Sequence, residues 1–142
     1  MILHIPHSSK TIPEKLRDQI VLSDEELADE LNLMTDAFTD ELFDLPGATV
    51  VRFPLSRLIV DVERFPDDAE EPMSKVGMGK FYTQTSHGHR LRRRLDRLET
   101  ELLLAEVYRP HHDYFTEVTT RALHQDGKAL ILDAHSLSLI HI

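Results

Sequence analysis

Cysteine and tryptophan are both absent from the 142-residue sequence, which has only five glycines and seven prolines. The lack of cysteine excludes disulfides and thiolate metal sites, so a transition metal would need histidine and carboxylate ligands. No apolar run approaches the roughly 20 residues of a membrane span, and the short apolar start is unlike a signal peptide. We therefore expect a cytoplasmic protein that has no membrane partner.

Basic residues are also scarce relative to acidic ones. Lys and Arg total 16 against 25 Asp and Glu, which gives a formal net charge of −9. This balance disfavours a phosphate-binding surface, so nucleic acid is not an expected partner. Hydrophobic residues make up 41% of the chain, enough for one globular domain whose stability does not require a cofactor. The oligomeric state cannot be read from the chain.

Short β-rich runs and helical periodicities alternate along the sequence, with a loop rich in proline, glycine and acids at 63–85. The strands are expected at 1–5, 48–53, 57–62 and 129–132. The helices are expected at about 24–43, at 89–105 and from 110 onwards. In the second of these helices, the arginines and acids outside the leucine stripe should form a solvated face. We predict an α/β fold with a mixed, largely parallel sheet between helical layers.

Two histidines follow the ends of predicted strands, where open α/β sheets collect their ligands. His7 follows the first strand and His135 the last, and neutral imidazoles can share one divalent ion if a carboxylate joins them. The alternative is that each histidine only bonds loop backbone. Asp36 is a candidate carboxylate, although a helical wheel places it opposite the apolar stripe and favours a solvated position.

Arg57 and Arg64 bracket the predicted strand 57–62. A guanidinium at a strand end offers a planar fork for a substrate carboxylate, and for Arg64 the alternative is a salt bridge to Glu63, Asp67 or Asp68. His111 and His112 open the third helix, where adjacent side chains point about 100° apart. At most one of these two histidines is therefore expected to face a given ligand.

Five segments that carry most of these candidates occur in a fixed order. They are His4-Ile5-Pro6-His7-Ser8-Ser9, Thr35-Asp36, the strand that ends in Asp61-Val62-Glu63-Arg64, Tyr108 to His112, and Asp133 to Ser136. They resemble the His-x-Pro-His-Ser-Gly, Thr-Asp, Asp-x-Asn-Arg, Tyr-x-Pro-Tyr-His and Asp-x-His-Ser segments of the N-formylglutamate amidohydrolase family. That family is related in fold to zinc carboxypeptidases and aspartoacylase-type deacylases. Five ordered matches are far more specific than one.

The resemblance implies a phosphorylase/hydrolase-like, zinc carboxypeptidase-like fold and a single zinc ion held by His7, Asp36 and His135. It also implies that Arg64, with Arg57, binds the carboxylates of a small anionic N-acyl amino acid. The implied reaction is zinc-assisted hydrolysis of N-formyl-L-glutamate to formate and L-glutamate, a step of histidine degradation.

His112 would lie near this site as a supporting group. Glu63 stands where the family pattern has asparagine, and its charge would repel a glutamate-like substrate unless an arginine neutralises it. A related N-acyl amino acid deacylase, or a carboxypeptidase-like enzyme with another substrate, is therefore the alternative within enzymes. A non-catalytic metal- or carboxylate-binding protein is the alternative from another class if the chain is complete.

The end of the chain departs from the family pattern. Family members are considerably longer, and no residue here matches the general base that carboxypeptidase relatives carry late in the chain, so the catalytic base is unknown. Residues 137–142 follow Asp-x-His-Ser abruptly and resemble translated adapter sequence. We expect residues 1–136 to be the N-terminal part of a single amidohydrolase domain that lacks its C-terminal part, and 137–142 to be a non-native tail.

Overall fold

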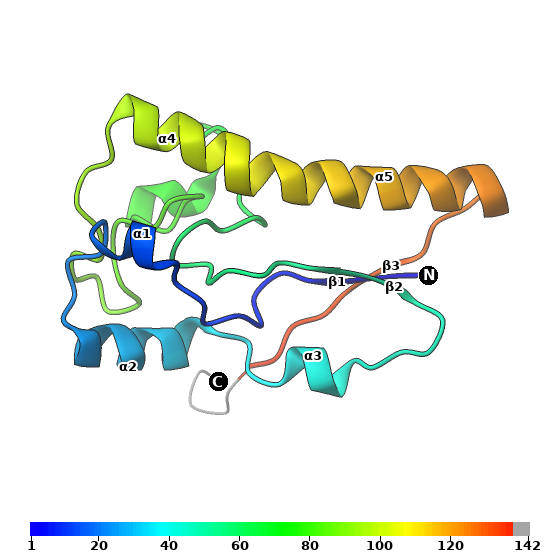
Figure 1. The fold of residues 1–142 in the computed structure, drawn as a ribbon, viewed down its shortest axis with the longest axis horizontal. Helices are drawn as coiled ribbons and strands as arrows, with labels where there is room; N and C mark the ends of the chain where they lie inside the picture. The colour runs from blue at the N-terminus through cyan, green and yellow to red at the C-terminus, as the bar shows by residue number, and fades with distance from the viewer. Residues whose placement is uncertain (138–142) are drawn as a thin grey trace.

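The computed structural model describes residues 1–137, so positions 138–142 of the predicted non-native tail lie outside the described residues. Three parallel strands and several helices alternate along the chain (Figure 1), which confirms the predicted α/β class. The strands are β1 (Ile2–Ile5), β2 (Thr49–Arg52) and β3 (Ile131–Asp133). The helices are α1 (Glu14–Arg17), α2 (Asp24–Met34), α3 (Thr39–Leu42), the 3₁₀-helix η1 (Pro72–Val76), α4 (Arg97–Leu103), the π-helix η2 (Leu104–Tyr108) and α5 (Arg109–Asp126).

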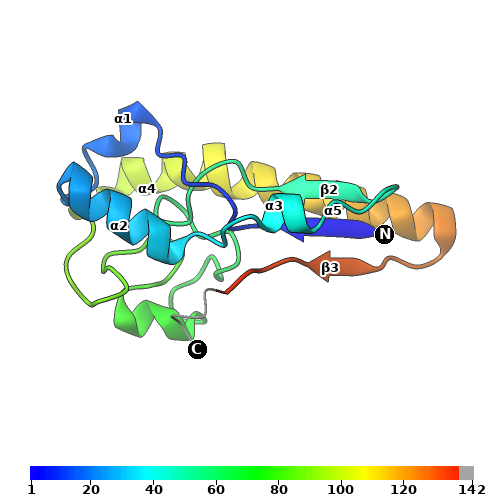
Figure 2. The same ribbon diagram turned by 90° about the horizontal axis from the view of Figure 1, so that it is seen from below.

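The sheet has the order β2–β1–β3, and both pairs are parallel. Figure 2 shows the strands side by side and pointing the same way. His4 lies opposite Val51 on one neighbour and Asp133 on the other. Because parallel strands end at the same edge, the residues that follow β1 and β3 are brought together there.

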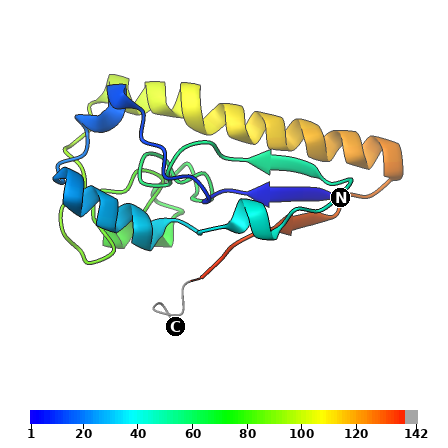
Figure 3. The same cartoon turned by 60° about the horizontal axis from the view of Figure 1, so that its bottom comes forward.

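Side chains of the central strand alternate between two apolar clusters, as the period of a β-strand requires. Ile2 packs with Val51 and Val118 on the face covered by α5, whereas Leu3 and Ile5 pack on the opposite face. Figures 1 and 3 show α5 on one side of the sheet and α2 and α3 on the other. The predicted burial between helical layers holds for β1 but not for β3, whose residues are all exposed.

The helix expected at about 24–43 begins as predicted but is not continuous. Ser23 and Glu26 form a capping box at its start, and α2 ends at Met34. The amide of Asp36 bonds the carbonyl oxygen of His7 at 3.0 Å, outside the helix, and Phe38 adopts a φ of 60° before α3 begins. The helical-wheel argument for a solvated Asp36 was therefore wrong, because Asp36 is not on a helix.

The strand expected at 57–62 is wrong as well. This segment forms turns, with the amide of Ile59 bonded to the carbonyl of Ser56 and the amide of Asp61 to that of Lys80. Its apolar run has the composition of a strand, but it is buried in the larger core cluster instead. The side chains of Arg57 and Asp61 join across the turn and hold this shape.

The helices expected at 89–105 and from 110 onwards form one rod over residues 97–126 (Figure 3). The rod starts at the capping box of Asp96 and Glu99, not at 89, and continues through η2 into α5. Residues before Asp96 are extended, and Arg92 is buried, so the predicted solvated helix face was wrong there. Within residues 1–137 the structure has no helix of the length and apolarity that a bilayer crossing needs.

Candidate metal and substrate site

The three predicted metal ligands meet at the carboxyl edge of the sheet. His7 follows β1, Asp36 lies between α2 and α3, and His135 follows β3. One ligand atom from each lies within 4.8 Å of the other two. His135 Nδ1 is 2.7 Å from Asp36 Oδ2, and the two imidazole rings are 5.4 Å apart. The topology of the sheet thus brings together residues that are 128 positions apart in the sequence.

His7 is held with one ring nitrogen bonded and the other open. Its Nε2 lies 2.9 Å from Asp61 Oδ1, and because a carboxylate only accepts, Nε2 carries the hydrogen and donates it. Nδ1 then keeps a lone pair. It is buried, lies 3.4 Å from Glu63 Oε2 and has no hydrogen-bond partner in the described part of the chain. A carboxylate behind a histidine is the usual support of a metal-binding imidazole. The residues present therefore fit a divalent ion on His7 Nδ1.

Glu63 is the second carboxylate that faces the histidines. Its Oε1 lies 3.2 Å from His135 Nε2, on the other side of the ring from Asp36. Burial opposes the charged imidazole, but the two carboxylates outweigh it and raise the pKa of His135. Glu63 thus faces two histidines, whereas the sequence analysis considered an arginine as the group that would neutralise its charge. The cluster has more negative than positive charge, which suits a cation.

Asp61 organises the buried side of the cluster and was missed as a site residue. Its Oδ2 accepts from Arg57 Nη2 and from the hydroxyl of Tyr82, both at 2.7 Å, and its Oδ1 accepts from His7. Burial favours the neutral carboxyl, but the bonds from His7 and Arg57 hold the pKa of Asp61 well below its usual range. The available signal was a lone acid inside an apolar run, with arginines at 57 and 64 around it.

The two predicted substrate-binding arginines both face Asp61. Arg57 uses Nη2 and Nε on Asp61 and Tyr82. Arg64 only approaches Asp61 Oδ2, with its Nε at 3.5 Å, and no group among residues 1–137 makes a hydrogen bond to its guanidinium. Among residues 1–137 Arg64 forms none of the salt bridges raised as the alternative, to Glu63, Asp67 or Asp68, and its donors are more available than those of Arg57.

His112 supports the site through the backbone. Its Nε2 lies 2.9 Å from the carbonyl oxygen of Val62, and burial lowers the pKa of His112. The ring of Tyr108 packs on it at 4.3 Å, and the Tyr108 hydroxyl donates to the carbonyl of Arg64 at 2.9 Å. Together these side chains fix the segment that carries Glu63.

His111 faces a different group from its neighbour, as expected for adjacent helical positions. It is buried, with Nε2 2.9 Å from His4 Nε2, and burial lowers its pKa to about 4. His4 is a buried histidine of β1, and its Nδ1 bonds Asp133 Oδ1 at 2.5 Å. This second group of histidines braces β1 against β3 and α5.

Comparison with known proteins shows which family the chain matches. Residues 1–141 match the family model described as N-formylglutamate amidohydrolase. An N-formylglutamate deformylase of Pseudomonas putida is 27% identical, over 96% of this chain and 51% of that protein.

Two solved structures share the fold. One is an N-formylglutamate amidohydrolase from Ralstonia eutropha, with a TM-score of 0.83 and 21% identity over 96% of this chain and 53% of that one. The other is a gene product from Agrobacterium tumefaciens, with a TM-score of 0.69 and 24% identity over 96% and 51%. The chain spans about half the length of these relatives.

Proposed function

Because the chain belongs to the N-formylglutamate amidohydrolase family, we propose that it acts in the zinc-dependent hydrolysis of N-formyl-L-glutamate to formate and L-glutamate. The open lone pair of His7 Nδ1 carries this proposal, since a buried acceptor between carboxylates needs a cation to bind. The name of the matched family and that of the Pseudomonas relative give the reaction.

His7, Asp36 and His135 would hold the zinc ion, and nitrogen and carboxylate ligands are those that catalytic zinc takes. When bound there, zinc would polarise the amide carbonyl and lower the pKa of a coordinated water. Asp61 orients His7 by accepting the hydrogen of Nε2, so that Nδ1 faces the cluster. Two histidines and one carboxylate leave a position for the reacting groups.

Arg64 would bind a substrate carboxylate, with Arg57 as its second contributor. Arg64 has its guanidinium free of hydrogen bonds among residues 1–137, whereas Arg57 keeps only Nη1 uncommitted beside Asp61 and Tyr82. A bidentate guanidinium–carboxylate pair would orient the amino acid part of the substrate. His112 would fix this side of the site through the backbone of Val62.

A second candidate function follows from Glu63. Neither Arg57 nor Arg64 forms an ion pair with Glu63 among the described residues, so its charge opposes an anionic substrate in the absence of a cation. This observation favours a related deacylase for an N-acyl amino acid with a less acidic side chain. A panel of N-formyl-L-glutamate, N-formyl-L-glutamine and N-formyl-L-leucine separates the two, and Glu63→Asn should shift preference toward the glutamate compound.

Zinc binding and formate release test the proposal together. Calorimetric titration of the metal-depleted chain should show one zinc per chain, and formate release should follow zinc addition and stop with a chelator. His135→Ala should abolish zinc binding, while His124→Ala, on the exposed end of α5, should not. Formate release that ignores the chelator would contradict the zinc mechanism. Full zinc binding without turnover of any panel compound would show that these residues supply the metal site but not the general base of the reaction.

A further inference from the structure

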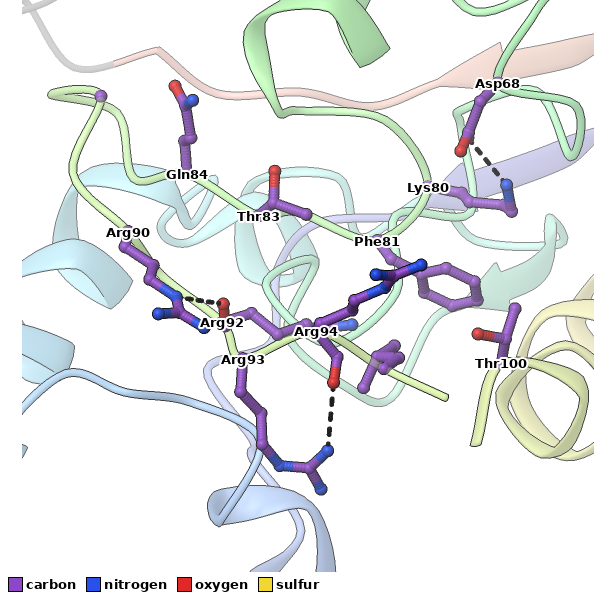
Figure 4. A pocket seen from close by; sticks show the side chains of 12 residues that line it. Asp68, Lys80, Phe81, Thr83, Gln84, Arg90, Arg92, Arg93, Arg94 and Thr100 are labelled. Carbon is purple, nitrogen blue, oxygen red and sulfur yellow. Dashed lines mark hydrogen bonds and ion pairs between the residues drawn. The ribbon is translucent and has the colours of Figure 1, made fainter. Parts of the chain in front are cut away.

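We propose that the cavity beside residues 90–95 is a second binding site, for a small organic anion with a phosphate or carboxylate group. The cavity has a volume of about 610 Å³, within the range of small-molecule sites. Figure 4 shows its side chains, which come from residues 90–94 and from a neighbouring segment with Phe81, Thr83 and Gln84. None of them belongs to the metal cluster, so the site stands apart from the amidohydrolase activity.

The charge around this cavity is opposite to that of the chain. Its basic side chains are Lys80, Arg90, Arg92, Arg93 and Arg94, and its acidic one is Asp68. Lys80 pairs with Asp68 at 2.7 Å, and Arg93 pairs with Glu99 at 2.6 Å. The other three arginines form no ion pair with any carboxylate of residues 1–137. In a chain of net charge −9, such a group concentrates anions at one place.

Arg92 is the most buried charged residue that lines the cavity. Only 3% of the residue is exposed, and its Nη2 donates to the carbonyls of Leu58 and Ile59, both at 2.7 Å. Its Nε and Nη1 are buried and have no hydrogen-bond partner within residues 1–137. Burial, with the nearby charge of Arg93, lowers the pKa of Arg92 to about 10, so the group stays charged at neutral pH. The charge of Glu99 acts in the opposite direction, but this carboxylate is already bonded to Arg93. A bound oxyanion would add the counter-charge that a buried cation favours.

The remaining lining restricts the ligand to a compact molecule with an apolar part. Phe81 places its ring 5.9 Å from the guanidinium carbon of Arg92, and Leu95 adds a second apolar wall. Thr83, Thr100 and Gln84 offer hydroxyl and amide groups beside the arginines. Planar guanidinium groups match carboxylate and phosphate oxygens in pairs of hydrogen bonds. The combination fits an organic phosphate or carboxylate better than a bare halide.

Calorimetric titration of the metal-depleted chain with inorganic phosphate and, separately, with glutarate tests the site. We expect saturable one-to-one binding of at least one probe, weakened at least tenfold by the double substitution Arg90→Gln and Arg94→Gln. Both side chains are exposed, so this variant should fold. Arg121→Gln, which removes an exposed arginine of α5, is the matched control and should bind normally.

Two further measurements keep the site distinct from the metal cluster. His135→Ala should leave probe binding unchanged, and saturation should shift the Nε resonance of Arg92 in arginine-selective NMR. Binding of phosphate alone or of glutarate alone would assign the group on the ligand. Absence of saturable binding below about 1 mM, loss of binding in His135→Ala, or full binding in the double variant would overturn the proposal.

Discussion

The metal cluster and the arginine cavity have opposite charge excesses, and at each a buried polar side chain has at least one atom without a hydrogen bond to residues 1–137. At the metal cluster that atom is an acceptor, His7 Nδ1, beside the carboxylates of Asp36 and Glu63. At the cavity the atoms are donors, Nε and Nη1 of Arg92, beside other arginines. Because unpaired buried polar groups are unfavourable, each region is suited to a ligand of the opposite charge.

The two regions differ in how the chain builds them. The ligands of the metal cluster come from distant parts of the sequence and meet because parallel strands end at one edge. The arginines of the cavity lie on one short extended segment that packs against residues 58–59. The charge balance at the buried side of each region also differs. At the metal cluster Asp61 bonds both His7 and Arg57, whereas at the cavity the hydrogen bonds that Arg92 donates within residues 1–137 go to neutral carbonyls. The substitutions below compare how much stability the folded chain loses when each buried charge is removed: that of Asp61, which has ion-pair partners, and that of Arg92, which has none among residues 1–137.

Asp61→Asn should have the largest effect on stability, a loss of about 3–5 kcal/mol. The amide has the shape of the carboxylate but removes the buried charge that Arg57 and Arg64 both face. Urea unfolding followed by circular dichroism measures the loss, with the exposed Asp113→Asn as control. A loss below about 1 kcal/mol would show that Asp61 is not the structural centre of the cluster.

Asp61 should also make the free energy of unfolding decrease at acid pH. The pKa of Asp61 is lowered in the folded state, so its contribution is present above the unfolded value near 3.9 and decreases as the pH falls below it. Asp61→Asn should remove this part of the pH dependence, and a pH series of urea midpoints measures it. If the urea midpoints of Asp61→Asn fall at acid pH as steeply as those of the native chain, other carboxylates cause the loss of stability.

Zinc should give the next largest effect. At a free concentration 100 times its dissociation constant, a ligand that binds only the folded state stabilises it by about 2.7 kcal/mol. Differential scanning calorimetry with and without zinc should show a rise in Tm for the native chain and none for His135→Ala. An equal rise in both proteins would place the ion away from His7, Asp36 and His135. Phosphate, by contrast, should raise the Tm of both.

Arg92→Met should have a smaller effect than Asp61→Asn, a loss of about 1–2 kcal/mol. It leaves the carbonyls of Leu58 and Ile59 without a donor, but it also removes a buried charge that has no counter-ion among residues 1–137. Urea unfolding beside the exposed control Arg121→Met measures it. A loss as large as that of Asp61→Asn would show that Arg92 contributes as much to stability as Asp61 does, although it forms no ion pair among residues 1–137.

Specific local signals predicted the structure better than apolar or charged composition did. The capping box of Ser23 and Glu26 predicted the start of α2, and the family resemblance implied the cluster of His7, Asp36 and His135. The run 57–62 was misassigned because a buried turn and a buried strand have the same apolar composition. Arg92 was placed on a solvated face because alternating charges are typical of such faces, while its burial depends on carbonyls that are 33 and 34 residues away.

Arg94→Gln should have the smallest effect on stability, and it tests most directly whether the cavity carries excess positive charge. Arg94 is exposed and forms no ion pair among residues 1–137, so it should contribute mainly repulsion toward the neighbouring arginines. Its removal should therefore stabilise the chain by a few tenths of a kcal/mol at low salt, within the about 0.5 kcal/mol typical of surface changes. The gain should vanish near 1 M salt, where screening extends over about 3 Å. With saturating phosphate the substitution should instead destabilise the chain, because Arg94 then attracts the bound anion. Urea midpoints under these three conditions measure the change in stability and its sign. A loss of stability at low salt without phosphate would mean that the charges of the cavity are already balanced within the chain.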